Sequence, residues 1–441
     1  MTLHKIWLVR LIVLIVPLIA VAAIQAQVNV GPPVQFASLS IPVGVETDLN
    51  GNVYTTSDNV FNTLITKYAP TGQPLAQARI GNFFSVDTIG KMARVPGTPH
   101  IVDLLPNGQL LIINTANGLI IPSYNLRTLP NIVTNEIYDL ASGQFGSAAG
   151  LIIPQQSSYG DIAVYRNGNT IDLLVSGNSI AFPFIMRVRF IPGQPPQAKV
   201  LITSLASAAP LNNVPRGVAV NSQGMVLTSL PFAFDDPQEN VDRAVLFHVN
   251  LPEERNIDNL PRFLLNRIDF SSRGMASDGV DNFYVATGGI GISQCGVLGS
   301  GVMVVISADL NNITCGLVSN APLIFSEDVA VAPDGSFAYM TVRNFNAVIR
   351  YPLLSTSSFS NSISNETDPT ALDSPNMFEP ITTPFNLIQT TPMTGTIPST
   401  VTTYLLTPTV PVTPGSHLIL TEPWLYDPST LNQVWLPVIQ K

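Results

Sequence analysis

The stretch Ile41–Gln73, IPVGVETDLNGNVYTTSDNVFNTLITKYAPTGQ, decides the fold. It holds a short apolar run, an Asn-Gly turn, an alternating run with β-branched residues, a loop and a third alternating run. Alternation bounded by Gly, Asn and Pro is typical of β-strands, and Asn-Gly is a strong signal for a tight antiparallel hairpin. The stretch therefore predicts a strand–turn–strand–loop–strand unit.

Degenerate copies of this unit recur along the chain. Each has a short apolar segment before the turn, two alternating runs after it, and a weaker fourth run before the next copy. No helical pattern separates the strands. The turn positions lie at intervals of 57, 60, 56, 57 and 54 residues, at Gly51, Gly108, Gly168, Gly224, Asp281 and Gly335. Six such units predict an all-β fold, a six-bladed β-propeller of four-stranded antiparallel blades.

The ring of blades must close. The segment Val34–Ser40 (VQFASLS) precedes the first inner strand and has no partner in its own repeat. The last unit has three clear strands and ends at Tyr351-Pro352. We therefore predict that Val34–Ser40 supplies the outer strand of the last blade.

The two ends of the chain differ from the repeats. Residues 1–26 have a positive start, an apolar run from Leu11 to Ile24 and small residues up to Ala26, a pattern that predicts a cleaved signal peptide. The apolar run is shorter than the ~20 residues that span a bilayer, although an uncleaved anchor is the alternative. No second long apolar run follows, so no membrane span is expected after signal removal.

The remaining chain divides by composition. The propeller is expected over 27–354, followed by a Ser/Thr/Pro-rich linker or stalk over 355–416, because such sequence buries little apolar surface. Residues 417–441 form a short apolar C-terminal segment with Trp424, Tyr426 and Trp435. This segment either packs on the propeller or serves as an export or surface-attachment signal.

Charge and cysteine content bound the compartment and the partners. Charged residues are 11% of the chain and the net charge is −9, which argues against nucleic acid as a partner because its binding needs clustered Lys and Arg. Cys295 and Cys315 are the two cysteines, and in an exported chain they predict one disulfide. We expect a secreted or cell-surface protein whose partner is an extracellular protein, a glycan or a small molecule.

Three of the repeats carry a family resemblance. GVETDLNGNVYTT, PRGVAVNSQGMVLTS and SEDVAVAPDGSFAYMTV resemble repeats of NHL and SMP-30-like six-bladed propellers, over roughly Val34–Leu354. The resemblance implies the blade architecture and specifies function poorly, since one fold hosts many functions. SMP-30-like lactonases hold a central divalent metal through Glu, Asn and Asp side chains, and streptogramin-lyase-like propellers depend on a catalytic His.

The first strand of each blade lines the central channel, so residues that open these strands should circle one mouth of it. The chemically active residues at these positions are expected to be His100, Asp161, Arg216, Arg273, Glu327 and Asp328. Two long loops are predicted on the same face, one acidic in blade four (Asp235, Asp236, Glu239, Asp242) and one glycine-rich in blade five. The ligand-binding mouth is expected there.

Each candidate has a functional and a structural interpretation. Arg216 and Arg273 suit a carboxylate or phosphate ligand, or they form ion pairs with Glu327, Asp328 and Asp161. Asp161, Glu327 and Asp328 are the candidate metal ligands, but the last two are neighbours on an alternating strand and cannot easily both point inward. The acidic loop suits calcium, or is simply solvated. His100 is a catalytic candidate or an ordinary mouth histidine.

Two functions from different classes follow. The first is a non-catalytic binding module for a protein, glycan or small anionic ligand at the channel mouth. The alternative is a metal-dependent hydrolase or lyase of the SMP-30-like lactonase type, in which calcium or another metal polarises a carbonyl or activates water. A surface-layer or adhesion role that uses the C-terminal segment as a tether is a third interpretation. No nucleophile elbow or Ser/His/Asp arrangement supports other hydrolytic chemistry.

Overall fold

The computed structural model describes the propeller strands and one short C-terminal segment. The described residues are 28–58, 63–80, 90–129, 137–140, 142–146, 157–178, 183–204, 217–231, 242–251, 253–263, 272–287, 302–317, 326–355 and 404–408. Within these residues, no helix is long and apolar enough to cross a membrane.

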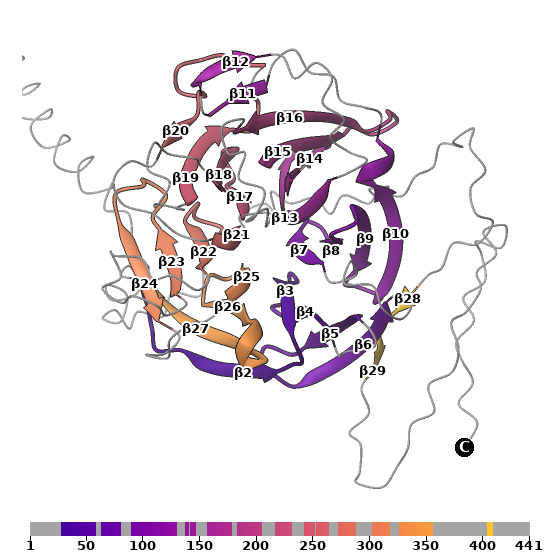
Figure 1. The fold of residues 1–441 in the computed structure, drawn as a ribbon. Helices are drawn as coiled ribbons and strands as arrows, with labels where there is room; N and C mark the ends of the chain where they lie inside the picture. Colours follow the sequence, from indigo (N-terminus) through magenta and orange to yellow (C-terminus); the bar gives the residue numbers. More distant parts are fainter. Residues whose placement is uncertain are drawn as a thin grey trace, which may run out of the picture.

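The strands form six sheets arranged around one axis, with β3, β7, β13, β17, β21 and β25 innermost (Figure 1). Blade 1 contains β3 (Pro42–Thr47), β4 (Val53–Asp58), β5 (Thr63–Tyr68) and β6 (Pro74–Ile80). Blade 2 contains β7 (Lys91–Arg94), β8 (His100–Leu104), β9 (Gln109–Asn114) and β10 (Leu119–Asn125). Blade 3 contains β13 (Ser158–Asn167), β14 (Thr170–Asn178), β15 (Pro183–Phe190) and β16 (Gln197–Thr203). At its outer edge, β11 (Ile137–Asp139) pairs parallel with β16 and antiparallel with β12 (Gln144–Gly146).

The second half of the ring repeats this order. Blade 4 contains β17 (Val218–Val220), β18 (Met225–Pro231), β19 (Asp242–His248) and β20 (Arg262–Phe263). Blade 5 contains β21 (Ser272–Ser277), β22 (Phe283–Thr287), β23 (Val302–Ile306) and β24 (Ile313–Leu317). Blade 6 contains β25 (Ser326–Val331), β26 (Phe337–Val342) and β27 (Ala347–Ser355), joined by β1 (Val28–Val30) and β2 (Val34–Ser38). The predicted six-bladed, four-stranded architecture is therefore confirmed.

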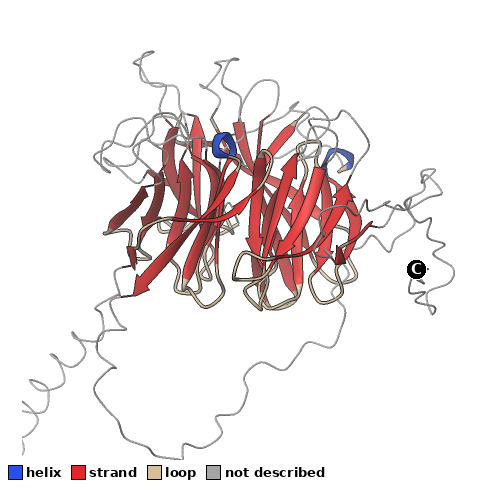
Figure 2. Ribbon diagram, turned by 90° about the horizontal axis from the view of Figure 1, so that it is seen from below, coloured by secondary structure: helices blue, strands red, loops and turns tan. Residues whose placement is uncertain are grey.

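The strand directions define two faces. Each inner strand begins on one face, which we name the mouth face, and its first hairpin turn lies on the other, the turn face. The short 3-10 helices η2 (Leu126–Thr128) and η4 (Arg343–Phe345) both lie on the mouth face (Figure 2). The helix η4 joins the second strand of blade 6 to the third, and η2 follows the fourth strand of blade 2. Figure 1 looks onto this mouth face.

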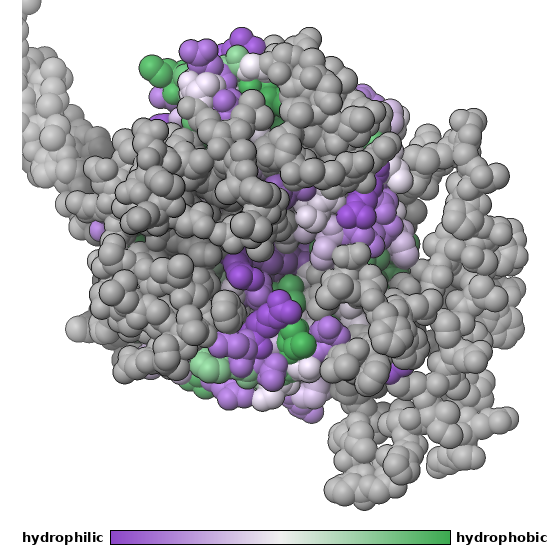
Figure 3. Space-filling view, in the orientation of Figure 1, coloured by the Kyte–Doolittle hydropathy of each residue, from purple (hydrophilic) through white to green (hydrophobic). Residues whose placement is uncertain are grey.

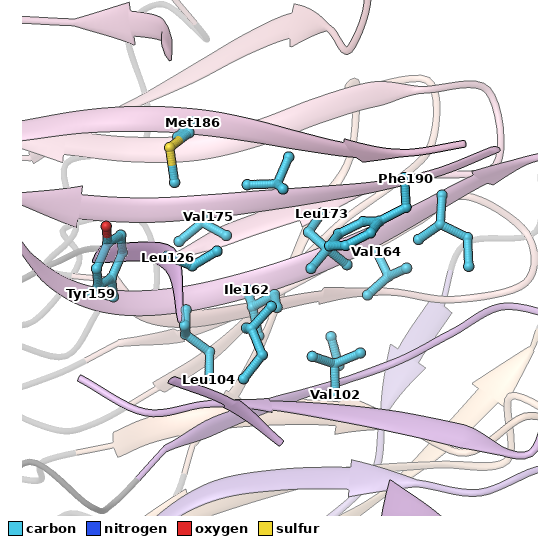
Figure 4. Packing of buried hydrophobic residues seen from close by; sticks show 14 of the residues in the cluster. Val102, Leu104, Leu126, Tyr159, Ile162, Val164, Leu173, Val175, Met186 and Phe190 are labelled. Atoms are coloured by element: carbon cyan, nitrogen blue, oxygen red, sulfur yellow. The ribbon is translucent and has the colours of Figure 1, made fainter. Parts of the chain in front are cut away.

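The core is divided among the contacts between neighbouring blades. The described residues include six clusters of buried hydrophobic side chains, and each draws its members from two adjacent blades. Between blades 2 and 3, Val102 and Leu104 of β8 face Ile162 and Val164 of β13 (Figure 4). Successive side chains of a strand point to opposite faces of its sheet. Each blade therefore packs one set of side chains against the blade before it and the other set against the blade after it.

A shared motif closes the first hairpins of blades 1 and 5. In blade 1, Asp48 accepts hydrogen bonds from the backbone N–H of Asn50 and Asn52, from the Asn52 side-chain amide and from the Tyr54 hydroxyl. Blade 5 repeats the pattern with Asp278. The D-x-x-x-N-x-Y pattern of the sequence thus satisfies buried donors within the turn itself.

The ring closes as predicted. β2 pairs antiparallel with β27, from Val34 opposite Arg350 to Ser38 opposite Ala347, and β1 pairs with the far end of β27. Ala37 is buried in the contact between blades 6 and 1, and Phe36 packs against Tyr68 and Tyr339. The N-terminal and C-terminal parts of the propeller therefore share one sheet.

Blade 2 corrects the sequence alignment. Its inner strand is β7, and its first hairpin turn runs from Val95 to His100, where Val95 N–H donates to the His100 carbonyl. The Asn107-Gly108 turn instead joins β8 to β9 on the mouth face. Two consecutive hairpins both carry turn residues, and the regular interval favoured the wrong one.

The C-terminal extension differs from the expected stalk at residues 404–408. β28 (Tyr404–Leu405) pairs with β10 of blade 2, and β29 (Thr407–Pro408) pairs with β6 of blade 1. Leu406 lies between them, is buried in the core cluster of blades 1 and 2, and donates its N–H to the Gly118 carbonyl. We name residues 404–408 the strap. Residues 417–441 lie outside the described residues.

The strap should contribute to stability. Leu406→Ala is expected to lower the free energy of unfolding by about 2–3 kcal/mol, because a buried leucine side chain is replaced by a cavity. Urea denaturation measures the change. Leu354→Ala is the control, because Leu354 is 55% exposed and its truncation should change stability little. Equal effects of the two substitutions would contradict a packed strap.

Candidate functional site

One ring of equivalent positions, one from each blade, surrounds the channel. In five blades, the ring residue lies four positions before the residue whose backbone N–H donates across the first hairpin turn. The sixth ring residue, Asp161, is equivalent to Gly44 and Asp328 because all three make the same hydrogen bond to the second strand. In these three the backbone N–H donates to a hydroxyl of the second strand, Thr56, Ser176 or Thr341, at 2.7–2.9 Å. We name this set the neck ring; it consists of Gly44, Lys91, Asp161, Gly217, Gly274 and Asp328.

Glycines let the inner strands converge at the neck ring. A Cβ at Gly274 would lie 2.5 Å from the Asp328 Cα and 2.8 Å from the Glu327 carbonyl oxygen. A Cβ at Gly44 would lie 2.5 Å from the carbonyl oxygen of Gly90 in the next blade. Such approaches exclude any side chain, so these glycines are required by the spacing of the strands.

Two carboxylates occupy the space that the glycines leave. Asp161 Oδ2 accepts the N–H groups of Val218 (2.8 Å) and Met275 (3.1 Å), the residues that follow Gly217 and Gly274. Asp328 Oδ2 accepts the N–H of Val45 (3.0 Å), which follows Gly44. The carboxylates therefore tie blade 3 to blades 4 and 5, and blade 6 to blade 1, across the channel.

The third charged member of the ring is Lys91. Asp161 and Asp328 are 1% exposed and Lys91 is 6% exposed. Burial raises the pKa of Asp161 to about 6, an effect that the Lys91 charge and the accepted N–H groups partly offset. Burial also raises the pKa of Asp328 well above its ordinary value; the Asp161 charge adds to this and Lys91 opposes it. The three groups thus act on one another in a low-dielectric neck.

These pKa shifts predict a pH dependence. Since the folded chain holds these protons to higher pH than the unfolded chain, the free energy of unfolding should fall as pH rises from about 4 to about 6. Asp161→Asn keeps an acceptor for both N–H groups and removes its titration, so it should lessen this fall, on the order of 2 kcal/mol. Urea denaturation at pH 4.5 and pH 7 measures it.

The control for this experiment is Asp258→Asn, which removes an exposed carboxyl group of blade 4. It should preserve the pH dependence of the unaltered chain. An Asp161→Asn variant whose stability changes with pH as steeply as that of the unaltered chain would contradict the assignment to the neck ring.

One position nearer the mouth, an arginine pair meets a single carboxylate. Arg273 Nη1 donates to Glu327 Oε1 at 3.0 Å and Oε2 at 3.3 Å, joining blade 5 to blade 6. Arg343 of η4 places its Nη1 3.7 Å from Glu327 Oε1, and its side chain is 51% exposed. Phe345, two residues further, is 43% exposed. We name Arg273, Glu327 and Arg343 the mouth triad.

The surface agrees with this arrangement. Around the axis of the mouth face, the described residues are mostly hydrophilic, with a small hydrophobic group beside them (Figure 3). The triad carries two guanidinium groups and one carboxylate, so it leaves a positive charge at the mouth of a chain whose net charge is −9.

The predicted site residues are only partly brought together. Asp161 and Asp328 meet in the neck ring, and Glu327 points instead to Arg273, as the alternation of the strand predicts. His100 is a correction: it starts β8, the second strand, on the turn face, because the first hairpin of blade 2 ends there. Burial lowers the pKa of its imidazole. Arg216, Cys295 and the two long loops lie outside the described residues, except that Asp242 begins β19; Cys315 lies on β24.

Sequence reasoning missed Lys91 and Arg343. Lys91 lies four residues before Val95, whose N–H closes the first hairpin of blade 2, and Gly44 and Asp328 have the same position in their blades. Aligning blade 2 on this turn would therefore have placed Lys91 in the ring. Arg343 lies in a short connection of blade 6 that no repeat pattern marks.

The neck ring does not fit the divalent metal that the family resemblance implies. The Oδ2 of each aspartate already accepts backbone N–H groups, Glu327 is paired with arginine, and the Lys91 charge faces the same space. A divalent ion such as calcium needs six to eight oxygen ligands. Among the described residues, no three His, Cys, Asp or Glu side chains are placed to hold a metal. The disulfide between Cys295 and Cys315 stays a prediction.

Comparison with known proteins identifies no family for this chain. No protein-family model matches the chain, and no curated protein matches it by sequence. Among solved structures, a protein of unknown function from Bacteroides thetaiotaomicron aligns with a TM-score of 0.42 at 10% identity, over 75% of this chain and 77% of its own. A proposed gluconolactonase gives 0.42 at 12%, over 74% and 93%. The Cps50 (Swd1) β-propeller domain of Myceliophteria thermophila gives 0.42 at 7%, over 74% and 100%.

Proposed function

We propose that this chain is a secreted or cell-surface β-propeller that binds a small anionic ligand at its mouth without catalysing a reaction. The observation that carries the proposal is the mouth triad, in which two arginines share one carboxylate on the mouth face. Guanidinium groups bind carboxylates and phosphates through paired, charge-assisted hydrogen bonds. The signal-like residues 1–26 support export.

The roles within the triad differ. Arg273 is 22% exposed and makes short hydrogen bonds to Glu327, so it holds blades 5 and 6 together. Arg343 is half exposed and lies further from the carboxylate, so it can turn toward a ligand at little cost. Phe345 offers an apolar surface on the same short helix. A small molecule with an acidic group and an apolar part matches these features.

The test is a titration with two probes, inorganic phosphate and succinate, followed by calorimetry. Arg343→Ala is expected to weaken binding by about tenfold or more, because a charge-assisted hydrogen bond contributes about 1.5–3 kcal/mol. Its melting temperature should change little, because exposed ion pairs stabilise weakly. Arg166→Ala removes a partly exposed positive charge on the turn face and is the control. Equal affinity of both variants for both probes would contradict a mouth site.

The alternative function, a metal-dependent hydrolase or lyase, predicts a different result. It requires a metal held by Asp161, Asp328 or Glu327, but the Oδ2 atom of each aspartate already accepts backbone N–H groups and Glu327 is paired with Arg273. Under that alternative, binding of either probe would depend on added divalent metal and would be lost in Asp161→Asn. Under the proposed function, Asp161→Asn binds phosphate and succinate as the unaltered chain does.

A further inference from the structure

The neck ring carries a charge arrangement that goes beyond ligand binding at the mouth. Two buried carboxyl groups, Asp161 and Asp328, share the ring with one buried ammonium group, Lys91. Each of the three comes from an inner strand, and glycine stands at the other three ring positions. Buried charges are stable only when compensated by opposite charge or by hydrogen bonds.

One further buried carboxyl group, Asp103 of β8, lies beside Gly90 and makes no hydrogen bond among the described residues, whereas the described arginines and glutamates on either side of the neck are already engaged. Toward the mouth, Arg273 and Arg343 face Glu327. Toward the turn face, the Glu46 carboxylate accepts the N–H of Arg94, and the Arg94 charge acts on it. Among the described residues, Lys91 is therefore the cation that remains for the two aspartates, and its charge favours the ionised form of both.

Lys91 acts without a direct hydrogen bond. Its Nζ and the Asp161 Oδ1 are both buried, and neither has a hydrogen-bond partner among the described residues. Unsatisfied buried polar atoms of this kind are commonly bridged by ordered water. Within the neck ring, the Oδ1 atom of Asp161 is therefore an acceptor that no other described donor occupies, and it can serve the Lys91 ammonium through a bridging water.

We infer that Lys91 is a tethered cation that replaces a metal ion at the centre of this propeller. Propellers that the chain resembles place a divalent metal near the axis, whereas here a side chain of blade 2 supplies the positive charge between the aspartates of blades 3 and 6. The replacement makes closure of the channel independent of any dissolved cation. It also accounts for the poor fit of the aspartates to a metal.

Chemical rescue tests this inference. In Lys91→Ala the two aspartates lose their cation, and the melting temperature at pH 7 is expected to fall by about 5–10 °C. Addition of n-propylammonium or calcium chloride, at ionic strength matched with sodium chloride, should restore part of the loss. The melting temperature of the unaltered chain should not respond to EDTA, calcium or propylammonium. Lys67→Ala, which removes a partly exposed lysine of blade 1, should show no rescue.

Two results would overturn the inference. The first is a Lys91→Ala variant as stable as the unaltered chain. The second is an unaltered chain that loses stability in EDTA. If Lys91→Ala does not fold, Lys91→Met combined with Asp161→Asn and Asp328→Asn removes the cation together with both carboxylates, and this triple variant should melt no more than about 3 °C below the Asp161→Asn, Asp328→Asn variant. A much lower melting temperature of the triple variant would assign Lys91 a packing role and overturn the inference.

Discussion

A chain that lacks residues 27–40 is expected not to form a stable propeller. The deletion removes β1 and β2, which pair with β27 and complete blade 6. It also removes Ala37 and Phe36 from the contact between blades 6 and 1, where Phe36 packs on Tyr68 and Tyr339. Because a folded domain is stable by only about 5–15 kcal/mol, loss of a whole strand from a closed ring removes most of that margin.

Soluble yield, gel filtration and thermal denaturation followed by circular dichroism measure this effect. The matched control lacks residues 27–33 and therefore loses β1 but keeps β2. The control is expected to fold and to melt at a lower temperature than the full chain. If the longer deletion melts cooperatively within a few degrees of the full chain, β2 does not close the ring.

Gly274→Ala is expected to destabilise the propeller strongly although it adds only one methyl group. The added Cβ would lie 2.4 Å from Asp328 Oδ1 and 2.5 Å from the Asp328 Cα, so two inner strands would have to separate. Overpacking of a rigid site costs about 1–3 kcal/mol and more when backbone must move. The separation would also lengthen the hydrogen bond from Met275 N–H to Asp161.

The same hairpin offers a matched control for this substitution. Gly279 lies in the first turn of blade 5, and a Cβ there would meet nothing within 4 Å. Gly279→Ala should therefore leave the midpoint of urea denaturation almost unchanged, whereas Gly274→Ala should lower it clearly. Similar midpoints for the two variants would show that the inner strands are not in contact at the neck ring.

The sequence was sufficient to predict the architecture of the ring. Alternating strands, turn residues and a nearly constant interval predicted six blades, and an unpartnered segment at Val34–Ser40 predicted the closing strand. These features are local, and a strand pattern has the same consequence in every blade. The prediction of Asp161 and Asp328 on one ring succeeded for the same reason.

Blade 2 shows where local reasoning failed. Its Pro96–Pro99 turn and its Asn107-Gly108 turn both suit a hairpin, and the sequence alone does not say which faces the mouth. The choice of the second turn placed His100 at the mouth and left Lys91 without a role. Aligning this one repeat on the wrong turn therefore left Lys91 out of the predicted ring.

Contacts between distant parts of the chain were also beyond the sequence. The hydrogen bond from Met275 N–H to Asp161 joins residues in blades 5 and 3, and nothing near either residue marks it. The strap pairs with blades 1 and 2 although its surroundings in the sequence are rich in Ser, Thr and Pro. Both contacts depend on the closure of the ring, which brings these residues together.

The metal content of the purified chain tests the central claim most directly. If Lys91 and the two aspartates close the neck, elemental analysis of protein dialysed against metal-free buffer should find no stoichiometric calcium, zinc or magnesium, and EDTA should leave the melting temperature unchanged. One tightly held divalent ion per chain, lost in Asp161→Asn together with thermal stability, would contradict this account and favour the metal-dependent hydrolase.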